Sequence, residues 1–205
     1  MFGQARIVEL ARDQMLFLAG DPGEGCYLVE EGLLKVNVVS PAGAERILAV
    51  LGPGALVGEL SMMDGKPRSA SVCAIRESRL AFVSRATFQA YARAQPEIHV
   101  YITELLTRRL RDIDDALTAT SLLPLKGRVA RALLSLAEAF GKDVGSGRIL
   151  IRQKVSQADI AAMAGISREN VSRILQDWKR RALVSRLAGH YCIERKAALE
   201  HEQEL

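Results

Sequence analysis

The chain of 205 residues is 49% hydrophobic and 25% charged, which is typical of a globular protein with a sizeable core. Its most apolar stretch, residues 47–63, is broken by glycines, Pro53 and Glu59, so a transmembrane helix is not expected, and three widely spaced cysteines without a CxxC pair argue against a disulfide framework or an iron–sulfur site. The net charge of +4 is unevenly spread: residues 148–196 hold 11 Lys and Arg against 4 Asp and Glu, which predicts a partner with phosphates unless it is only a solvated basic surface.

The front half is predicted to be an antiparallel β-roll. Residues 1–12 indicate a short helix or arm. Short apolar or alternating runs then predict strands at residues 15–18, 26–29, 33–39, 47–51, 71–75 and 79–83. Turn sequences rich in Gly and Pro separate these runs, and Glu31-Gly32 is one of the expected turns. Short strands with regular turns indicate a sandwich or a roll.

One segment inside this roll has residues suited to hold a sugar and a phosphate. Residues 58–72 consist of GEL, six further residues, and PRSASV. The carboxylate of Glu59 can accept hydrogen bonds from a sugar diol, and Arg68 can grip a phosphate with two parallel bonds. Ser69 and the neighbouring backbone N–H groups can complete a phosphate nest. A surface Glu–Arg pair across a loop, worth about 0–1 kcal/mol, would explain the same residues without any ligand.

A long amphipathic helix is predicted from Glu97 to Thr120, with a length of roughly 36 Å. Residues at alternating spacings of four and three form the a/d seam of a coiled coil: His99, Thr103, Leu106, Leu110, Ile113, Leu117 and Thr120. A second apolar edge lies beside it, formed by Ile98, Ile102 and Leu105. Two apolar edges indicate two partners, which are its own domain and a second copy of the chain. The alternative is a long helix packed inside a monomer.

The back half is predicted to contain a hinge at Pro124 and an amphipathic helix over residues 126–140. A loop to residue 147 and a short strand over residues 148–152 follow. A hairpin wing is expected around Gly189, and Trp178 is expected in the core of this domain.

The most specific pattern is VSQADIAAMAGISRENVSRILQDWKRR, residues 155–181. Ser156 with Asp159 predicts a capping box at the start of one helix, and Ser167 is a good N-cap for a second, with Gly165 in the turn between them. The positions expected to be buried are Ile160, Ala164, Ile166, Val171 and Ile174. This is the pattern of a helix-turn-helix, and an ordinary helical hairpin is the alternative.

In a docked helix-turn-helix the second helix enters the major groove by its N-terminal end. Arg168 and Arg173 can grip guanine there, and Glu169 can accept from cytosine. Glu169 and Arg173 are also spaced for an ordinary i,i+4 surface pair. Further groups are expected to contact phosphates and so position the helix: Arg152, Lys154, Gln157, Lys179, Arg180 and Arg181.

These segments, in this order, resemble the cyclic-AMP receptor/fumarate-nitrate regulator (CRP/FNR) superfamily over nearly the whole chain. GEL-SMMDGK-PRSASV is similar to the phosphate-binding cassette of its cyclic-nucleotide-binding domains, and Ser-Arg-Glu-x-Val-x-Arg is similar to the recognition helix of its cyclic-AMP receptor branch. The resemblance implies an α+β protein with an N-terminal antiparallel β-roll, a long dimerisation helix and a C-terminal winged helix-turn-helix. It places the effector domain at residues 1–122, including a dimerisation helix at 97–122, and the DNA-binding domain at 123–205.

The resemblance also implies roles for single residues. In the family the cassette Glu binds the ribose 2′-hydroxyl, and the Arg and the next small residues hold the cyclic phosphate. The implied effector-binding residues are Gly58, Glu59, Leu60, Ser61, Arg68, Ser69, Ala70, Arg109 and Asp114. The implied DNA-binding residues, for a TGTGA-type half-site, are Gln157, Ser167, Arg168, Glu169, Ser172, Arg173 and Lys179. The implied dimer seam is Thr103, Leu106, Leu110, Ile113 and Leu117.

One pair of residues departs from the family. Members that respond to cyclic AMP carry an adjacent Thr-Ser that contacts adenine, and this chain has Ile113-Asp114 there. Cyclic AMP is the favoured effector, with cyclic-di-GMP or no obligatory ligand as alternatives. We expect a cytoplasmic homodimer that binds double-stranded DNA and RNA polymerase, without a metal, a membrane or catalytic activity. The competing interpretation is a cyclic-nucleotide-binding adaptor that does not bind DNA.

Overall fold

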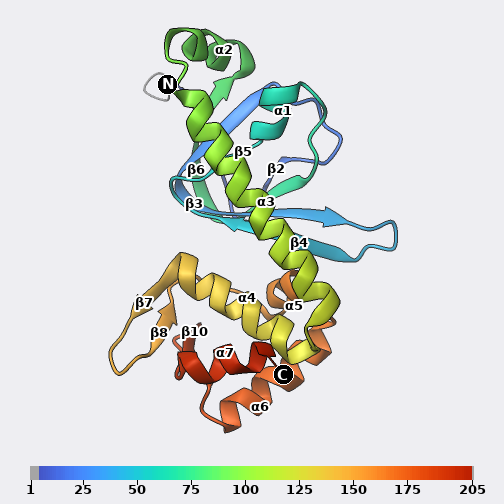
Figure 1. Ribbon diagram of the computed structural model, residues 1–205, viewed down its shortest axis with the longest axis vertical. Coiled ribbons are helices and arrows are strands. Elements are labelled where there is room, and N and C mark those ends of the chain that lie inside the picture. The colour runs from blue at the N-terminus through green and yellow to red at the C-terminus, as the bar shows by residue number, and fades with distance from the viewer. Residues whose placement is uncertain (1–4, 205) are drawn as a thin grey trace. The chain divides into compact units, whose positions relative to one another are not determined.

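The computed structural model describes residues 5–204 of the chain (Figure 1). The chain divides into two compact units, Met1–Leu110 and Arg111–Leu205. The division falls within a long helix, α3 (Ile98–Leu122), which begins in the first unit and ends in the second. No helix in the described part of the chain is both long enough and apolar enough to cross a membrane.

Two long strands form the centre of the first unit. Within its described residues, six strands form one antiparallel sheet in the order β1-β6-β3-β4, with β2 paired to β6 and β5 paired to β3. They are β1 (Arg6–Leu10), β2 (Met15–Phe17), β3 (Gly25–Val39), β4 (Glu45–Leu51), β5 (Leu56–Val57) and β6 (Ser71–Ser84). The predicted antiparallel β-roll is therefore confirmed.

The strands β3 and β6 each join two of the predicted strands into one. The expected turn at Glu31-Gly32 is wrong, because these residues form a bulge where the register between β3 and β6 shifts. Gly32 has a φ of 105°, and a Cβ on it would lie 2.1 Å from the Oγ of Ser78. The same Oγ accepts a hydrogen bond of 3.1 Å from the N–H of Leu33. Glycine is needed here by the bulge and not by a turn.

The beginning of the first unit also differs from the prediction. The described part of residues 1–12 is not a helix or arm but the edge strand β1, which pairs with β6 in register from Arg6↔Phe82 to Leu10↔Ser78. Residues 1–4 lie outside the described part. Ile7 and Val8 favour a strand, but so short a run does not decide its own pairing, and it becomes a strand because β6 offers its edge.

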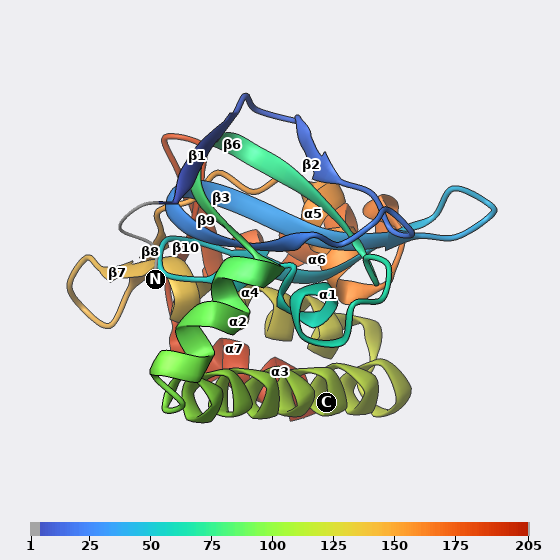
Figure 2. The same ribbon diagram turned by 90° about the horizontal axis from the view of Figure 1, so that it is seen from above.

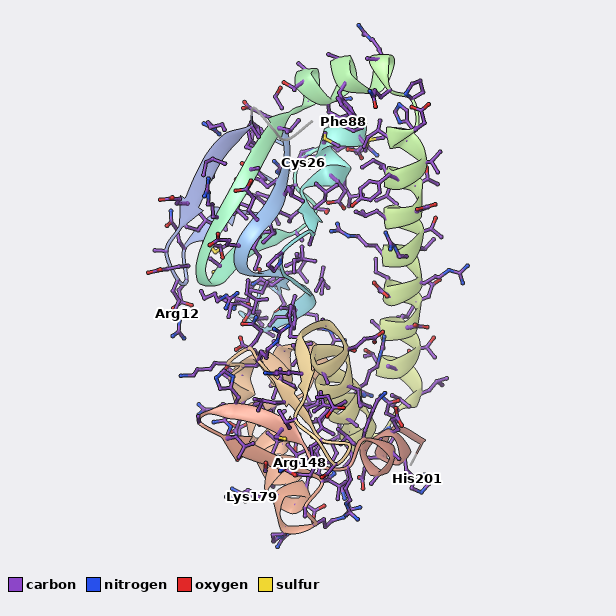
Figure 3. All side chains as sticks on the ribbon, turned by 90° about the vertical axis from the view of Figure 1, so that its left-hand side faces the viewer. Arg12, Cys26, Phe88, Arg148, Lys179 and His201 are labelled. Carbon is purple, nitrogen blue, oxygen red and sulfur yellow. The ribbon has the colours of Figure 1, made fainter. Side chains whose placement is uncertain are left out.

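Three helices pack together on one side of the roll (Figures 1 and 2). They are α1 (Glu59–Asp64), α2 (Arg85–Ala94) and the first part of α3. Their buried side chains share one core cluster with the roll, and it contains Cys26, Leu56, Met62, Val83, Phe88, Ala92 and Ile102. Cys26 and Phe88 are labelled in Figure 3. Ile98 and Leu105 pack beside Ile102, so the predicted second apolar edge of α3 contacts its own domain.

The helix α2 was not predicted. Ser84 precedes it and accepts a hydrogen bond of 3.1 Å from the N–H of Thr87, which is an ordinary N-cap. Phe88 and Ala92, four residues apart, form its buried face. The cap and this spacing were the signals in the sequence that could have predicted α2. They were overlooked because α2 is a short amphipathic stretch between the stronger patterns of β6 and α3.

The second unit consists of helices around a small sheet. After the end of α3 its elements are α4 (Leu125–Phe140), β7 (Gly141–Asp143), β8 (Ile149–Ile151), α5 (Gln157–Ala164), α6 (Arg168–Arg180), β9 (Val184–Leu187), β10 (His190–Ile193) and α7 (Lys196–Glu204). The sheet has the order β7-β8-β10-β9. The predicted wing is confirmed as the β9–β10 hairpin, whose turn has positive φ at Ala188 and Gly189. The strand β7 lies where a loop was expected, and α7 was not predicted.

Candidate functional site

The cassette of the first unit surrounds the start of α1. Gly58 precedes this helix with a φ of 80°, and a Cβ there would lie 2.3 Å from Nη1 of Arg68, so the close approach needs glycine. Glu59 and Arg68 are 1% and 5% exposed, which is unusual for charged side chains. Of the other predicted cassette residues, Ser61 and Ala70 are buried, and Leu60 and Ser69 are exposed.

Among the described residues, no carboxylate forms an ion pair with the buried guanidinium of Arg68. Its Nη1 donates to the backbone oxygen of Gly58 at 2.8 Å, and its Nε has no hydrogen-bond partner among the described residues. Burial lowers the pKa of this group, because burial disfavours the charged form. Arg nevertheless keeps its charge in proteins. The cassette therefore contains a buried cation with a free donor, which is an arrangement that an anion would complete.

The partner of Glu59 is not Arg68, the residue that the sequence analysis considered. Its Oε1 accepts from Arg109 on α3, and Arg109 also donates to the backbone oxygen of Leu56. The alternative of a bare Glu59–Arg68 surface pair therefore does not describe this structure: both side chains are buried, and each contacts something else. Gly58, Glu59, Arg68 and Arg109 thus meet in one place, as the predicted site requires.

Of the remaining residues predicted for α3, all except Leu106 are solvent-exposed. Leu110, Ile113 and Leu117 are 59%, 61% and 66% exposed. Thr103 is exposed and donates to the oxygen of His99 at 2.8 Å, and Leu106 is partly buried against the first unit's core. Asp114 is exposed and belongs to the second unit, so it is not part of the cassette cluster just described.

The helix-turn-helix of the second unit begins and ends where the capping residues predicted. Ser156 and Asp159 form a reciprocal capping box, with hydrogen bonds of 3.0 Å in both directions. Gly165 ends α5 with a φ of 66°, and Ser167 accepts from the N–H of Asn170 at 3.3 Å to begin α6. Val171, Ile174, Leu175 and Trp178 form the buried face of α6. The expected buried positions are confirmed except Ile166, which is only partly buried.

The opposite face of α6 presents the residues predicted to read bases. Arg168, Glu169 and Arg173 are exposed, and Ser172 is partly buried. Arg173 donates to the side chain of Asn170 and not to Glu169, so the ordinary i,i+4 pair is not its arrangement. The pKa of Glu169 is lowered by two hydrogen bonds to its carboxylate, the first from the backbone N–H of Glu169 itself and the second from the Ser167 hydroxyl. Glu169 is therefore an ionised acceptor at neutral pH.

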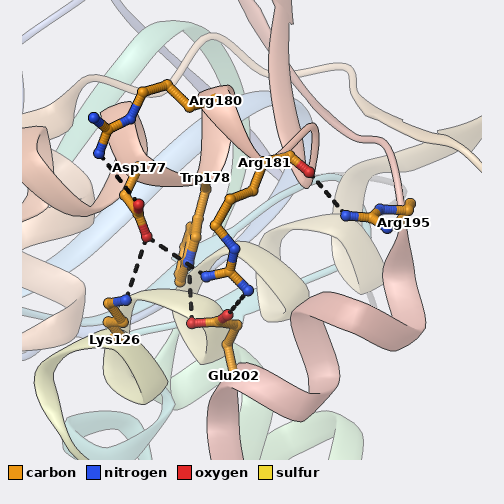
Figure 4. Close-up of polar contacts among 7 residues, drawn as sticks. All are labelled: Lys126, Asp177, Trp178, Arg180, Arg181, Arg195 and Glu202. Carbon is orange, nitrogen blue, oxygen red and sulfur yellow. Dashed lines mark hydrogen bonds and ion pairs between the residues drawn. The ribbon is translucent and has the colours of Figure 1, made fainter.

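The residues predicted to contact phosphates are divided between two surroundings. Lys179 is exposed at the surface of this unit (Figure 3), and Gln157 is partly buried at the start of α5. Ser167, which was predicted among the DNA-binding residues and not as a phosphate contact, is also exposed. Arg180 and Arg181 instead contact Asp177, at 3.3 and 3.5 Å (Figure 4). Arg181 also pairs with Glu202 of α7 at 2.5 Å. The sequence interpretation did not include Glu202, because no local pattern connects it to α6.

The two sites define a class of protein: a ligand-binding roll joined by a long helix to a winged helix-turn-helix, which is the arrangement of an effector-responsive DNA-binding regulator. The family model described as cyclic nucleotide-binding domain matches residues 7–95, and the one described as Crp-like helix-turn-helix domain matches residues 127–202. The chain belongs to the CRP/FNR family of transcription regulators.

Similar proteins cover most of the chain. It is 34% identical to the CRP-like cAMP-activated global transcriptional regulator of Mycobacterium tuberculosis, over 91% of this chain and 82% of that protein. It is 36% identical to the Cyclic AMP receptor protein of Thermus thermophilus, over 90% and 82%. Among solved structures, FixK2 of Bradyrhizobium japonicum has a TM-score of 0.84 at 20% identity, covering 96% of both chains. The c-di-GMP responsive global regulator CLP of Xanthomonas campestris has a TM-score of 0.78 at 21% identity, covering 94% and 95%. These two structural likenesses concern the fold alone.

Proposed function

We propose that this chain is an effector-gated transcription regulator that binds a cyclic nucleotide, with cyclic AMP favoured, and a TGTGA-like DNA palindrome as a homodimer. It acts in the cytoplasm, with RNA polymerase as a further partner. Residues 1–122 sense the effector and residues 123–205 bind DNA, with the functional boundary at the end of α3. The observation that carries the proposal is the buried guanidinium of Arg68, whose Nε has no hydrogen-bond partner among residues 5–204, in the same cassette as the buried carboxylate of Glu59.

A cyclic nucleotide matches the donors and acceptors of the cassette. The edge of the guanidinium that carries Nε can donate two parallel bonds to a phosphate, because Nη1 is already used by Gly58. Glu59 has a second carboxylate oxygen, which can accept from a sugar hydroxyl. Cyclic AMP is the first choice because two relatives above 30% identity are named for it.

The adenine half of the site is where the alternatives diverge. Ile113 cannot hydrogen-bond a base, and Asp114 can accept from an amino group. A different nucleotide, such as cyclic-di-GMP, would use other base contacts, and a pocket without an obligatory ligand would need none. The Xanthomonas protein is described as c-di-GMP responsive, and at 21% identity its likeness to this chain concerns the fold and not the ligand.

A second copy of the chain is the partner that the exposed apolar stripe of α3 requires. Leu110, Ile113 and Leu117 are each more than half exposed and lie at a/d spacing. A contiguous apolar stripe of this kind marks an interaction surface. Two copies related by a two-fold axis would each supply the same stripe, so the pairing is self-complementary.

The effector and the DNA are linked through α3. A sugar hydroxyl at Glu59 shares this carboxylate with Arg109, so binding changes a contact between the cassette and the helix. In a dimer such a change shifts the population toward the form whose two recognition helices lie one DNA turn apart, ~34 Å. Arg168, Glu169 and Arg173 then read bases, and Lys179 and Gln157 contact phosphates.

Isothermal titration calorimetry with cyclic AMP, cyclic GMP and cyclic-di-GMP tests the effector. We expect cyclic AMP to bind the wild type, and Arg68→Ala to weaken it by about 100-fold, since two charge-assisted hydrogen bonds are lost. Arg79→Ala is the matched control, because this exposed residue pairs with Glu30 at 3.2 Å, outside the cassette, and should leave the affinity unchanged. Unchanged affinity in Arg68→Ala would refute the cassette assignment, and tighter binding of cyclic-di-GMP would select that alternative.

The competing interpretation of the sequence was a cyclic-nucleotide-binding adaptor that never binds DNA, and the match of residues 127–202 to the Crp-like helix-turn-helix model argues against it. A gel shift on a TGTGA-type palindrome separates the two, with a scrambled duplex as control and a series of salt concentrations. Specific DNA binding should favour the palindrome and fall steeply with salt, because phosphate contacts release counterions. Equal and weak binding of both duplexes at every salt concentration would favour the adaptor.

A further inference from the structure

We propose that Phe17 is a positioning residue of the effector site, which holds the Arg68 guanidinium in the orientation that grips the effector's phosphate. The Cζ atom of Arg68 lies 4.2 Å from the centroid of the Phe17 ring. The inference rests on the proposed function, because Phe17 acquires this role only if Arg68 binds an anion.

Backbone hydrogen bonds bring the two residues together across the chain. Phe17 ends β2, and the turn after it is closed by the side chain of Asp21, which accepts from the N–H of Leu18 at 2.8 Å. The backbone of Arg68 is bound to the same turn on both sides. Its N–H donates to the backbone oxygen of Asp21 at 2.9 Å, and its backbone oxygen accepts from the N–H of Gly20 at 2.8 Å. These backbone hydrogen bonds therefore place the Phe17 ring next to the Arg68 guanidinium.

Two contacts then fix the orientation of the guanidinium. The Phe17 ring holds the guanidinium carbon over its face, and the hydrogen bond of 2.8 Å from Nη1 to the backbone oxygen of Gly58 fixes the direction of Nη1. The Tyr27 ring lies farther away, with its centroid 6.0 Å from the guanidinium carbon. The edge of the guanidinium that carries Nε therefore has a fixed orientation before a ligand binds. A donor held in place in this way loses less conformational entropy on binding.

An aromatic ring does more here than fill space. Arg68 is 5% exposed, and the carboxylate of Glu59 is used by Arg109. The negative face of the Phe17 ring attracts the cation, and this attraction is strongest where water is excluded. A leucine at this position would occupy a similar volume without attracting the charge. The Phe17 ring thus holds the buried Arg68 guanidinium in place and leaves the edge of the guanidinium that carries Nε free to bind an anion.

Calorimetry with cyclic AMP on the full chain tests the proposal. We expect Phe17→Leu to weaken binding about tenfold and Phe17→Tyr, which keeps the ring, to stay within about twofold of the wild type. Phe82→Leu is the matched control: its ring belongs to the same aromatic cluster, 4.9 Å from Tyr27, but it stacks with Arg6 at 5.0 Å. This control should also stay within about twofold. Thermal melting reports folding, and Phe17→Met replaces Phe17→Leu if the latter does not fold.

The decisive arm repeats Phe17→Leu in the Arg68→Ala background. If the ring acts through Arg68, the second substitution adds less than about a twofold loss there. A full tenfold loss in that background, or equal losses in Phe17→Leu and Phe82→Leu, would overturn the proposal and make Phe17 a packing residue. Absence of cyclic-nucleotide binding by the wild type, or full affinity in Arg68→Ala, would instead overturn the proposed effector site itself.

Discussion

Replacement of Glu202 by alanine is expected to destabilise the second unit more than its place in the last helix suggests. Glu202 is 4% exposed, and it accepts from the buried Nε1 of Trp178 at 3.2 Å and from Arg181 at 2.5 Å (Figure 4). Trp178 is fully buried on the inner face of α6. The substitution therefore leaves a buried indole N–H without an acceptor, directly behind the recognition helix.

The magnitude follows from the burial of each partner. An unsatisfied buried donor costs about 1–3 kcal/mol. Arg181 adds little, because its side chain is 46% exposed and water can replace the lost carboxylate. We expect a loss of about 2 kcal/mol in the free energy of unfolding for Glu202→Ala and less than about 1 kcal/mol for Glu202→Gln, which keeps an acceptor for the indole.

The assay is urea denaturation followed by tryptophan fluorescence. Trp178 is the single tryptophan of the chain, so its emission reports this unit. Glu200→Ala is the control on the same helix, since Glu200 forms an exposed pair with Lys196 at 3.4 Å and its replacement should change stability by less than about 0.5 kcal/mol. Equal effects of Glu202→Ala and Glu200→Ala, or of Glu202→Ala and Glu202→Gln, would refute this reasoning.

Two further predictions concern DNA and the second copy. Arg168→Ala or Arg173→Ala should cost about 1–3 kcal/mol on the palindrome and relax the preference at one base position, as measured by gel shift on single-base variants. A uniform loss on all duplexes would make that Arg a phosphate contact. Leu117→Asp should shift the chain from dimer to monomer in analytical ultracentrifugation, because it places a charge in the apolar seam, and Thr118→Asp on the exposed flank should not. A dimer that survives Leu117→Asp would place the interface elsewhere.

Local patterns predicted the second unit better than the first. The capping box of Ser156 and Asp159 and the N-cap at Ser167 involve groups three residues apart, so the sequence contains all the atoms that decide where α5 and α6 begin. The apolar edges of α3 are also a local feature, because they consist of residues three and four positions apart on one helix. The strand β1 and the bulge at Gly32 were missed, because each depends on a partner in β6 that lies far along the chain.

The candidate effector site shows the same limit in its details. The residue types of Glu59 and Arg68 indicated a sugar and a phosphate, and the family resemblance added Arg109 to the predicted effector-binding residues. The contact of Phe17 with Arg68 was not predicted, because it depends on how the end of β2 meets the loop before β6. Glu202 behind the recognition helix was missed for the same reason, since α7 reaches α6 only after folding.

By itself, the sequence determined the order of the roll, the long helix and the winged helix-turn-helix, and it predicted the residues that we propose to hold a phosphate and to read bases. Caps, turns and helical stripes connect neighbours within about one turn, so they are encoded locally. Only the tertiary structure decided which partner each charged side chain contacts: Glu59 binds Arg109, Arg68 stacks on Phe17, and Arg181 pairs with Glu202. A buried charge takes the partner that strand pairing and helix packing place within reach, and that choice involves residues far apart in the chain.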